Sequence, residues 1–151
     1  MPVYDDEAQI RGYLEGLRMS VPMAERVISL IDEFQSFMGT APEFVFVENP
    51  IDALGAIEFS NLICLTGNSY LEFSISQPNR VLTFLNIGKN INRILMPTMH
   101  QMSFSEVTER SRLTVQLCTD LQVISFFSAS GRNCQELLDM TKRYFIPAIG
   151  T

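Results

Sequence analysis

His100, the only histidine of the chain, is the side chain best suited by type to acid–base chemistry near neutral pH. A general base needs a nucleophile and an orienting partner, and a metal site needs several ligands. The sequence supplies neither beside His100. In a strand, His100 shares parity with Met102 and Phe104, which predicts a ring facing the apolar side or its rim. We therefore expect a structural histidine, no metal and no cofactor. A small enzyme that uses His100 in a ligand cavity is the enzyme-class alternative.

Three cysteines, Cys64, Cys118 and Cys134, form no CxxC pair, and their odd number favours a reducing compartment over a disulfide framework. They fall in predicted strands and on the apolar stripe of a predicted helix, where a thiol acts as a small hydrophobe. No basic residue is placed to lower a thiol pKa. The glycine-rich nucleotide loops, the HExxH zinc motif and the GxSxG hydrolase motif are absent as well. These observations predict a protein that is not an enzyme.

Five basic residues fall at the ends and turns of predicted strands, and they are the candidate binding site: Arg80, Lys89, Arg93, Arg110 and Arg112. Together they would form a basic edge for an acidic ligand. The alternative is that they are solvated, or that they pair with the acidic N-terminal helices.

The charge of the chain is divided unevenly along its length. The net charge is −6, but residues 1–58 hold eleven carboxylates against three cations, a net −8, whereas residues 59–151 hold six against eight, a net +2. An acidic total disfavours nucleic acid and anionic lipid as partners, because both attract basic proteins. The two segments are expected to dock on each other, within one chain or between neighbouring copies.

The first 39 residues are predicted to form an acidic helical extension. Ile10, Tyr13, Leu14 and Leu17 recur at the spacing of one helix face. A second apolar stripe runs from Met23 to Met38, with a start signal at Ser20 before Pro22 and a stop at Gly39. The following connector, residues 40–56, includes one β-prone run, 44–47.

From residue 57 the apolar period changes to two, and turn residues separate short runs. This pattern predicts seven antiparallel strands: 57–65, 70–76, 80–86, 91–96, 99–104, 112–118 and 121–127. A closing helix follows, with Ser128 or Ser130 as its cap and Pro147 at its end. The expected fold is a single α+β domain, residues 1–151, with a seven-stranded meander closed by a C-terminal helix and preceded by two helices.

Residues 57–146 resemble a bacterial pleckstrin-homology-like domain in their layout. The resemblance rests on Arg93–Met96, Ser111–Leu117 and Gln122–Phe126, followed by the closing helix. It implies a sheet or barrel that binds a protein partner, often as an oligomer. The first hairpin, Leu65–Ser69, has no basic residue, whereas lipid-binding members of that family carry clustered Lys and Arg there. Phosphoinositide binding is therefore not expected.

The sequence favours a non-catalytic protein-interaction or assembly module that binds through an exposed strand edge or a helix groove. A small acidic secretion-type chaperone is the alternative within the binding class, and it would place a helix between strands. The N-terminal residues carry no basic region followed by an apolar run, and no stretch is long enough to span a bilayer. A cytoplasmic protein that is not integral to a membrane is therefore expected.

Overall fold

The computed structural model describes residues 7–67, 69–75, 82–86, 91–120 and 122–149. The chain divides into two compact units, residues 1–47 with 61–85 and residues 48–60 with 86–151. The backbone therefore passes from one unit to the other three times. The two units do not correspond to the two halves of the sequence on either side of residue 57. Their net charges are −5 and −1, so the contrast in charge is smaller between the units than between the two halves of the sequence.

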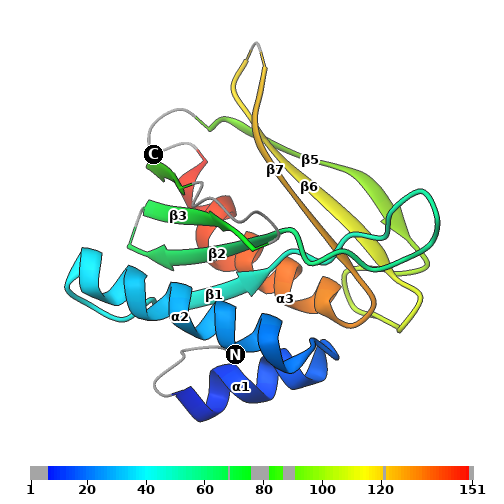
Figure 1. The fold of residues 1–151 in the computed structure, drawn as a ribbon. Helices are drawn as coiled ribbons and strands as arrows, with labels where there is room; N and C mark the ends of the chain where they lie inside the picture. The colour runs from blue at the N-terminus through cyan, green and yellow to red at the C-terminus, as the bar shows by residue number, and fades with distance from the viewer. Residues whose placement is uncertain (1–6, 68, 76–81, 87–90, 121, 150–151) are drawn as a thin grey trace. The chain divides into compact units, whose positions relative to one another are not determined.

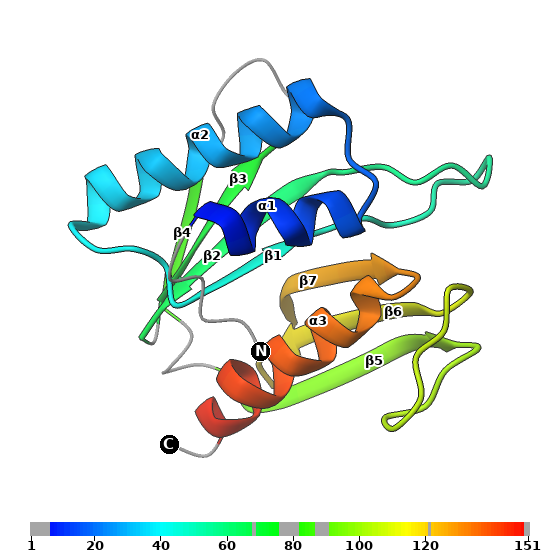
Figure 2. The same cartoon turned by 90° about the horizontal axis from the view of Figure 1, so that it is seen from below.

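The first unit consists of two helices and a four-stranded sheet, in which the β1–β2 and β2–β3 pairs are antiparallel. The helices are α1 (Glu7–Gly16) and α2 (Val21–Met38), and the strands are β1 (Phe44–Val47), β2 (Asn61–Thr66), β3 (Ser69–Ser74) and β4 (Leu82–Asn86), in the order β1-β2-β3-β4. Figures 1 and 2 show the two helices side by side, with α2 crossing one face of this sheet. All four residues of β1 are buried, as a continuous apolar run predicts.

Helix α2 begins and ends where its sequence predicts. The Ser20 hydroxyl accepts a hydrogen bond from the Met23 amide at 3.4 Å, and Pro22 lies in the first turn. Gly39 adopts φ +76°, and its amide donates to the Gln35 carbonyl at 2.9 Å. The buried residues Val27, Ile28, Leu30, Ile31 and Phe34 form the core-facing stripe of the helix.

The second unit packs one helix against a three-stranded antiparallel sheet. Strands β5 (Arg93–His100), β6 (Arg112–Cys118) and β7 (Val123–Ser130) lie in the order β5-β6-β7, and α3 (Asn133–Met140) covers one face. A π-turn at Thr141–Phe145 and a 3-10 turn at Ile146–Ala148 extend α3. Phe127 of β7 stacks on Phe145 with ring centroids 5.3 Å apart, which joins the end of this helical segment to the sheet.

The single seven-stranded meander is wrong, although the α+β class is confirmed. In the described residues six strands follow residue 57, because the predicted strands 91–96 and 99–104 are the single strand β5. They belong to two open sheets rather than a barrel. Pro97 lies between the two predicted strands and lacks an amide donor, but the edge strand β5 continues through it with a register shift between Leu95 and Thr98.

The predicted cap of the last helix is also wrong. Ser128 and Ser130 both lie within β7, and α3 begins after the turn at Gly131, without a side-chain cap. Gly131 has φ +62°, which glycine adopts without strain, and its amide donates to the Ser111 carbonyl at 2.7 Å. Helical winding also continues past Pro147 to Ala148 as the 3-10 turn.

In the part of the chain that the structure describes, none of the helices is both long enough and apolar enough to span a membrane.

Candidate functional site

The outward face of the three-stranded sheet carries a row of three side chains, one from each strand. Leu95 of β5 and Phe126 of β7 both lie opposite Gln116 of β6. Residues opposite each other in antiparallel strands point to the same face. Phe126 is 60% exposed and Leu95 is 38% exposed. We call this surface the open sheet face.

The helix-covered face of the same sheet is buried. Leu113, Val115 and Leu117 alternate with the outward residues of β6 and are at most 1% exposed. Phe126 and Phe127 therefore separate to opposite faces of β7, because successive residues of a strand point in opposite directions. Because Phe126 and Phe127 are adjacent in a strand that is buried on one face, one of them must lie on the other face, and this is the sequence signal that could have identified Phe126.

No carboxylate lies among the strand residues that the register assigns to the open sheet face. Around the central row these residues are Arg93, Thr98, His100, Arg112, Thr114 and Ser128, together with the buried Cys118 and Ser130. The face therefore has an apolar centre, neutral polar residues beside it, and an arginine toward each end. Such a surface suits a partner that combines apolar and acidic side chains.

One edge of this sheet is covered by side chains from the segment before β2. The Glu48 carboxylate accepts a hydrogen bond from the Ser128 amide at 3.1 Å. Asn49 Oδ1 accepts from the Ser130 amide at 3.0 Å, and Asn49 Nδ2 donates to the Ser130 carbonyl at 3.3 Å. Both side chains are buried, so they occupy backbone positions of β7 that a further strand would use.

The other edge, along β5, is interrupted by Pro97 and by the register shift beside it. Proline cannot donate to a ladder, and it is a common device against pairing with another chain. The exposed strand edge that the sequence suggested as a binding mode is therefore poorly suited at both sides of this sheet. The open sheet face is the better candidate.

The structure separates the basic residues that were predicted to form one edge. Arg80 and Lys89 lie outside the described residues. Arg93 pairs with Cys118 at one end of the β5–β6 ladder, and Arg112 pairs with His100 at the other end. The two ends are roughly 20 Å apart at the rise of a strand. Arg93 and Arg112 flank the open sheet face instead of forming a cluster.

Arg110 lies next to this face, in the connection between β5 and β6. Its amide donates to the Thr108 hydroxyl at 3.2 Å, and its side chain is exposed. Ser111 fixes the same connection, because its buried hydroxyl donates to the Gln101 carbonyl at 2.9 Å and accepts from the Thr108 amide at 2.8 Å. The structure thus brings Arg110 and Arg112 to the same end of the sheet.

His100 is exposed on the open sheet face and does not point to the apolar side. The prediction placed His100 in one strand with Met102 and Phe104, but β5 ends at His100, so that parity does not apply. His100 Nε2 lies 3.3 Å from Gln101 Nε2. Within the described ranges, no group of three or more His, Cys, Asp or Glu side chains is placed to hold a metal ion.

All three cysteines are buried, as the sequence predicted for small hydrophobic residues. Burial raises the pKa of Cys64 above its usual range and raises the pKa of Cys134 to about 12. Because the thiolate is the nucleophile, both thiols are poorly suited to covalent chemistry near neutral pH.

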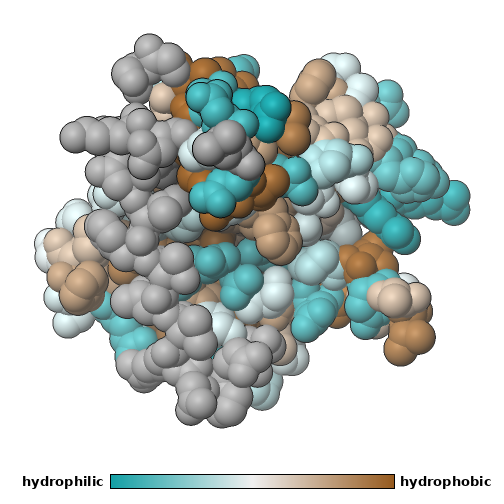
Figure 3. Space-filling view, turned by 90° about the horizontal axis from the view of Figure 1, so that it is seen from above, coloured by the Kyte–Doolittle hydropathy of each residue, from teal (hydrophilic) through white to brown (hydrophobic). Residues whose placement is uncertain are grey.

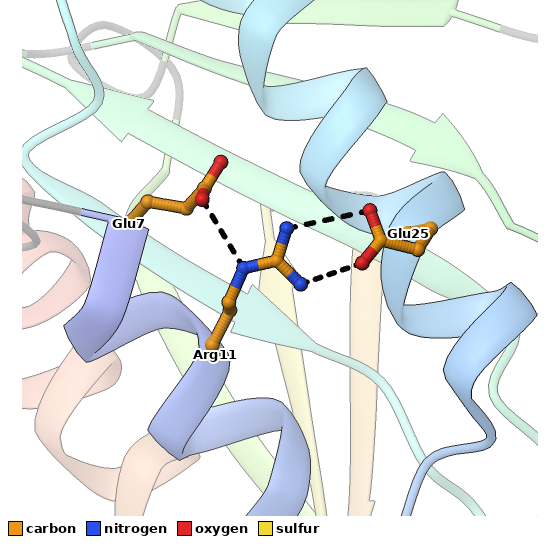
Figure 4. A network of polar contacts seen from close by, with 3 residues as sticks. All are labelled: Glu7, Arg11 and Glu25. Atoms are coloured by element: carbon orange, nitrogen blue, oxygen red, sulfur yellow. Dashed lines mark hydrogen bonds and ion pairs between the residues drawn. The ribbon is translucent and has the colours of Figure 1, made fainter.

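The outward side of α2 is a second exposed surface, and it belongs to the first unit. Glu25 lies on it and receives two hydrogen bonds from the Arg11 guanidinium, at 2.6 and 3.3 Å, while Glu7 receives a third at 3.2 Å (Figure 4). Arg11 lowers the pKa of Glu25 through these bonds and its charge. Asp32 and Phe37 are exposed on the same helix. Asp32 lies on the same side of α2 as Glu25, whereas Phe37 lies about 140° around the helix from Asp32.

Other apolar residues reach the surface singly, and on the face drawn in Figure 3 they do so in several separate places. In the second unit, Leu54 is 94% exposed at the tip of a turn. The Asp52 carboxylate orders that turn by accepting from the amides of Leu54 and Ala56 at 2.8 and 2.9 Å. Single exposed apolar residues are common on protein surfaces, so the exposure of Leu54 alone does not indicate a binding site.

Comparison of the chain with protein-family models, with curated proteins and with solved structures finds no match. The pleckstrin-homology-like resemblance stays a prediction.

Proposed function

We propose that this protein is a non-catalytic assembly module, in which copies of the chain associate through the open sheet face. The observation that carries the proposal is the row Leu95–Gln116–Phe126, which lies between Arg93 and Arg112 on a face whose assigned strand residues include no carboxylate. Burying exposed Phe and Leu side chains contributes favourably to association, roughly 25 cal/mol for each Å² removed from water.

Three features favour a second copy as the partner. The chain supplies a basic, apolar-centred surface in one unit and an excess of carboxylates in the other unit. The β7 edge is covered and the β5 edge carries a proline, which disfavours open-ended strand pairing. The pleckstrin-homology-like resemblance adds support, because bacterial members of that family are often oligomeric.

The experiment compares the mass of the wild-type chain in solution with the masses of F126S and L54S, by light scattering over a range of concentrations. The wild-type mass is expected to rise above that of the monomer, and F126S is expected to remain monomeric. The matched control L54S removes a more exposed apolar side chain of the same unit and is expected to behave as wild type. A monomeric wild type would refute the proposal. An F126S variant that associates like wild type would refute the assignment to the open sheet face.

A further inference from the structure

We propose that the open sheet face of one copy binds the outward side of helix α2 of a second copy, so that copies associate head to tail. This inference rests on the proposed assembly function. It adds the identity of the segment that covers the open sheet face.

Charge is the first reason for choosing α2. Two open sheet faces placed against each other would bring Arg93 and Arg112 against the same arginines of the other copy, and juxtaposed like charges weaken binding. Helix α2 holds three carboxylates, Glu25, Asp32 and Glu33, against one cation, Arg26, a net charge of −2. Asp32 is exposed to solvent. The two surfaces are complementary in charge, whereas two sheet faces are not.

Exposed apolar side chains are the second reason. Phe37 is 70% exposed near the end of α2, and Val21 is 74% exposed at its beginning. Val21 precedes Asp32 by 11 residues, so at about 100° per residue the two side chains lie on the same side of the helix, opposite the buried stripe. Phe37 lies about 160° around the helix from Val21, on the flank of that stripe. On the open sheet face, Phe126 and Leu95 are likewise exposed to solvent. Aromatic residues are enriched among the side chains that dominate interface energies.

The lengths of the two surfaces also agree. Helix α2 has 18 residues and is therefore about 27 Å long at 1.5 Å per residue. Strand β5 has eight residues, or about 26 Å at the rise of a strand. A helix lying along the strands can reach both the apolar centre of the open sheet face and an arginine at its end.

This arrangement has a consequence for assembly. Each copy offers one sheet face and one helix surface, which makes the interface heterologous. Interfaces of this kind give rings when the rotation closes and open chains when it does not. A copy that lacks one surface still offers the other, so two different defective variants can form a single contact between them.

The experiment uses two variants of the full chain. In the sheet variant, F126S/R112E, the open sheet face loses its aromatic residue and one arginine. In the helix variant, V21S/D32K, the outward side of α2 loses an exposed apolar side chain and an exposed carboxylate. All four positions are exposed, so both variants are expected to keep the wild-type circular dichroism spectrum and melting transition. Masses are measured for each variant alone and for an equimolar mixture at low salt.

Head-to-tail binding predicts that each variant alone is monomeric and that their mixture forms a 1:1 dimer through the two intact surfaces. The variant E15K, an exposed charge change on α1, is the control and is expected to associate as the wild type does. A helix variant that still self-associates while the sheet variant does not would overturn the inference in favour of sheet-to-sheet pairing, and the proposed function would stand. A mixture that stays monomeric while the wild type associates would also overturn it. A monomeric wild type would refute the proposed function and the inference with it.

Discussion

The side-chain amide of Asn49 pairs with the backbone of Ser130 as a neighbouring strand would, donating to its carbonyl at 3.3 Å and accepting from its amide at 3.0 Å. The Ser130 hydroxyl donates in return to the Asn49 carbonyl at 2.6 Å, and Asn133 Nδ2 donates to Asn49 Oδ1 at 2.9 Å. These groups are buried. The network ties the segment after β1 to the end of β7 and closes that edge of the sheet.

Replacing Asn49 by alanine is expected to lower the free energy of unfolding by about 1–3 kcal/mol, because buried donors on Ser130 and Asn133 lose their acceptor. Chemical denaturation measures the change. Asn92→Ala is the matched control, since Asn92 is an exposed residue of the same unit that hydrogen-bonds Asp120. It is expected to change the free energy of unfolding by less than about 0.5 kcal/mol. Equal effects of the two substitutions would contradict the role given to Asn49.

The Asn49 network shows the limit of what the sequence could predict. Helix α2 was predictable because its signals are local: Ser20 and Pro22 mark its start, Gly39 marks its end, and an apolar stripe repeats at each turn between them. Strand β6 was predictable because its alternation is regular. Asn49 and Ser130 are 81 residues apart, and no local pattern connects them. The same holds for the open sheet face, whose three residues meet only through the register of three strands.

Glu136 of α3 provides a test of pH dependence. Its Oε2 atom is buried and has no hydrogen-bond partner among the described residues. Burial, and secondarily the charge of Asp139, raises the pKa of Glu136. The folded state therefore holds this proton to a higher pH than the unfolded chain, so stability is lost as the pH rises through the ordinary Glu value toward the raised one.

The neutral substitution Glu136→Gln is accordingly expected to raise the melting temperature at pH 7. The difference from wild type should shrink at a pH below the ordinary Glu pKa, where the wild-type carboxyl is also neutral. Melting curves at the two pH values measure it. Gln135→Glu, at an exposed position of the same helix, is the control and should not raise the melting temperature at pH 7. A Glu136→Gln variant that is less stable at pH 7 would show that its ionised form is favourable.

The pairing of α1 with α2 predicts a pKa that can be measured directly. The Glu25 carboxyl is expected to titrate below the ordinary Glu range, because the Arg11 guanidinium hydrogen-bonds it and carries the opposite charge. In Arg11→Met the pKa of Glu25 should return toward the ordinary value, as measured by NMR titration. Arg18→Met should leave it unchanged. A normal pKa in the wild type would mean that the interaction drawn in Figure 4 is not maintained in solution.

The buried cysteines predict that thiol chemistry reports unfolding. Under native conditions at pH 8, a thiol reagent is expected to label Cys64 and Cys134 only slowly, since both are buried and their pKa values are raised. All three cysteines should react quickly in guanidinium chloride, which is the positive control. Mass spectrometry counts the labels. Rapid native labelling of Cys64 or Cys134 would contradict the burial assigned here.

The most direct test of the account is sedimentation equilibrium of the wild-type chain and of F126S over a wide concentration range at low salt. The account predicts that the wild-type mass rises with concentration above the 17.1 kDa of one chain, while F126S remains at that mass. A wild-type mass of 17.1 kDa at every concentration would contradict it.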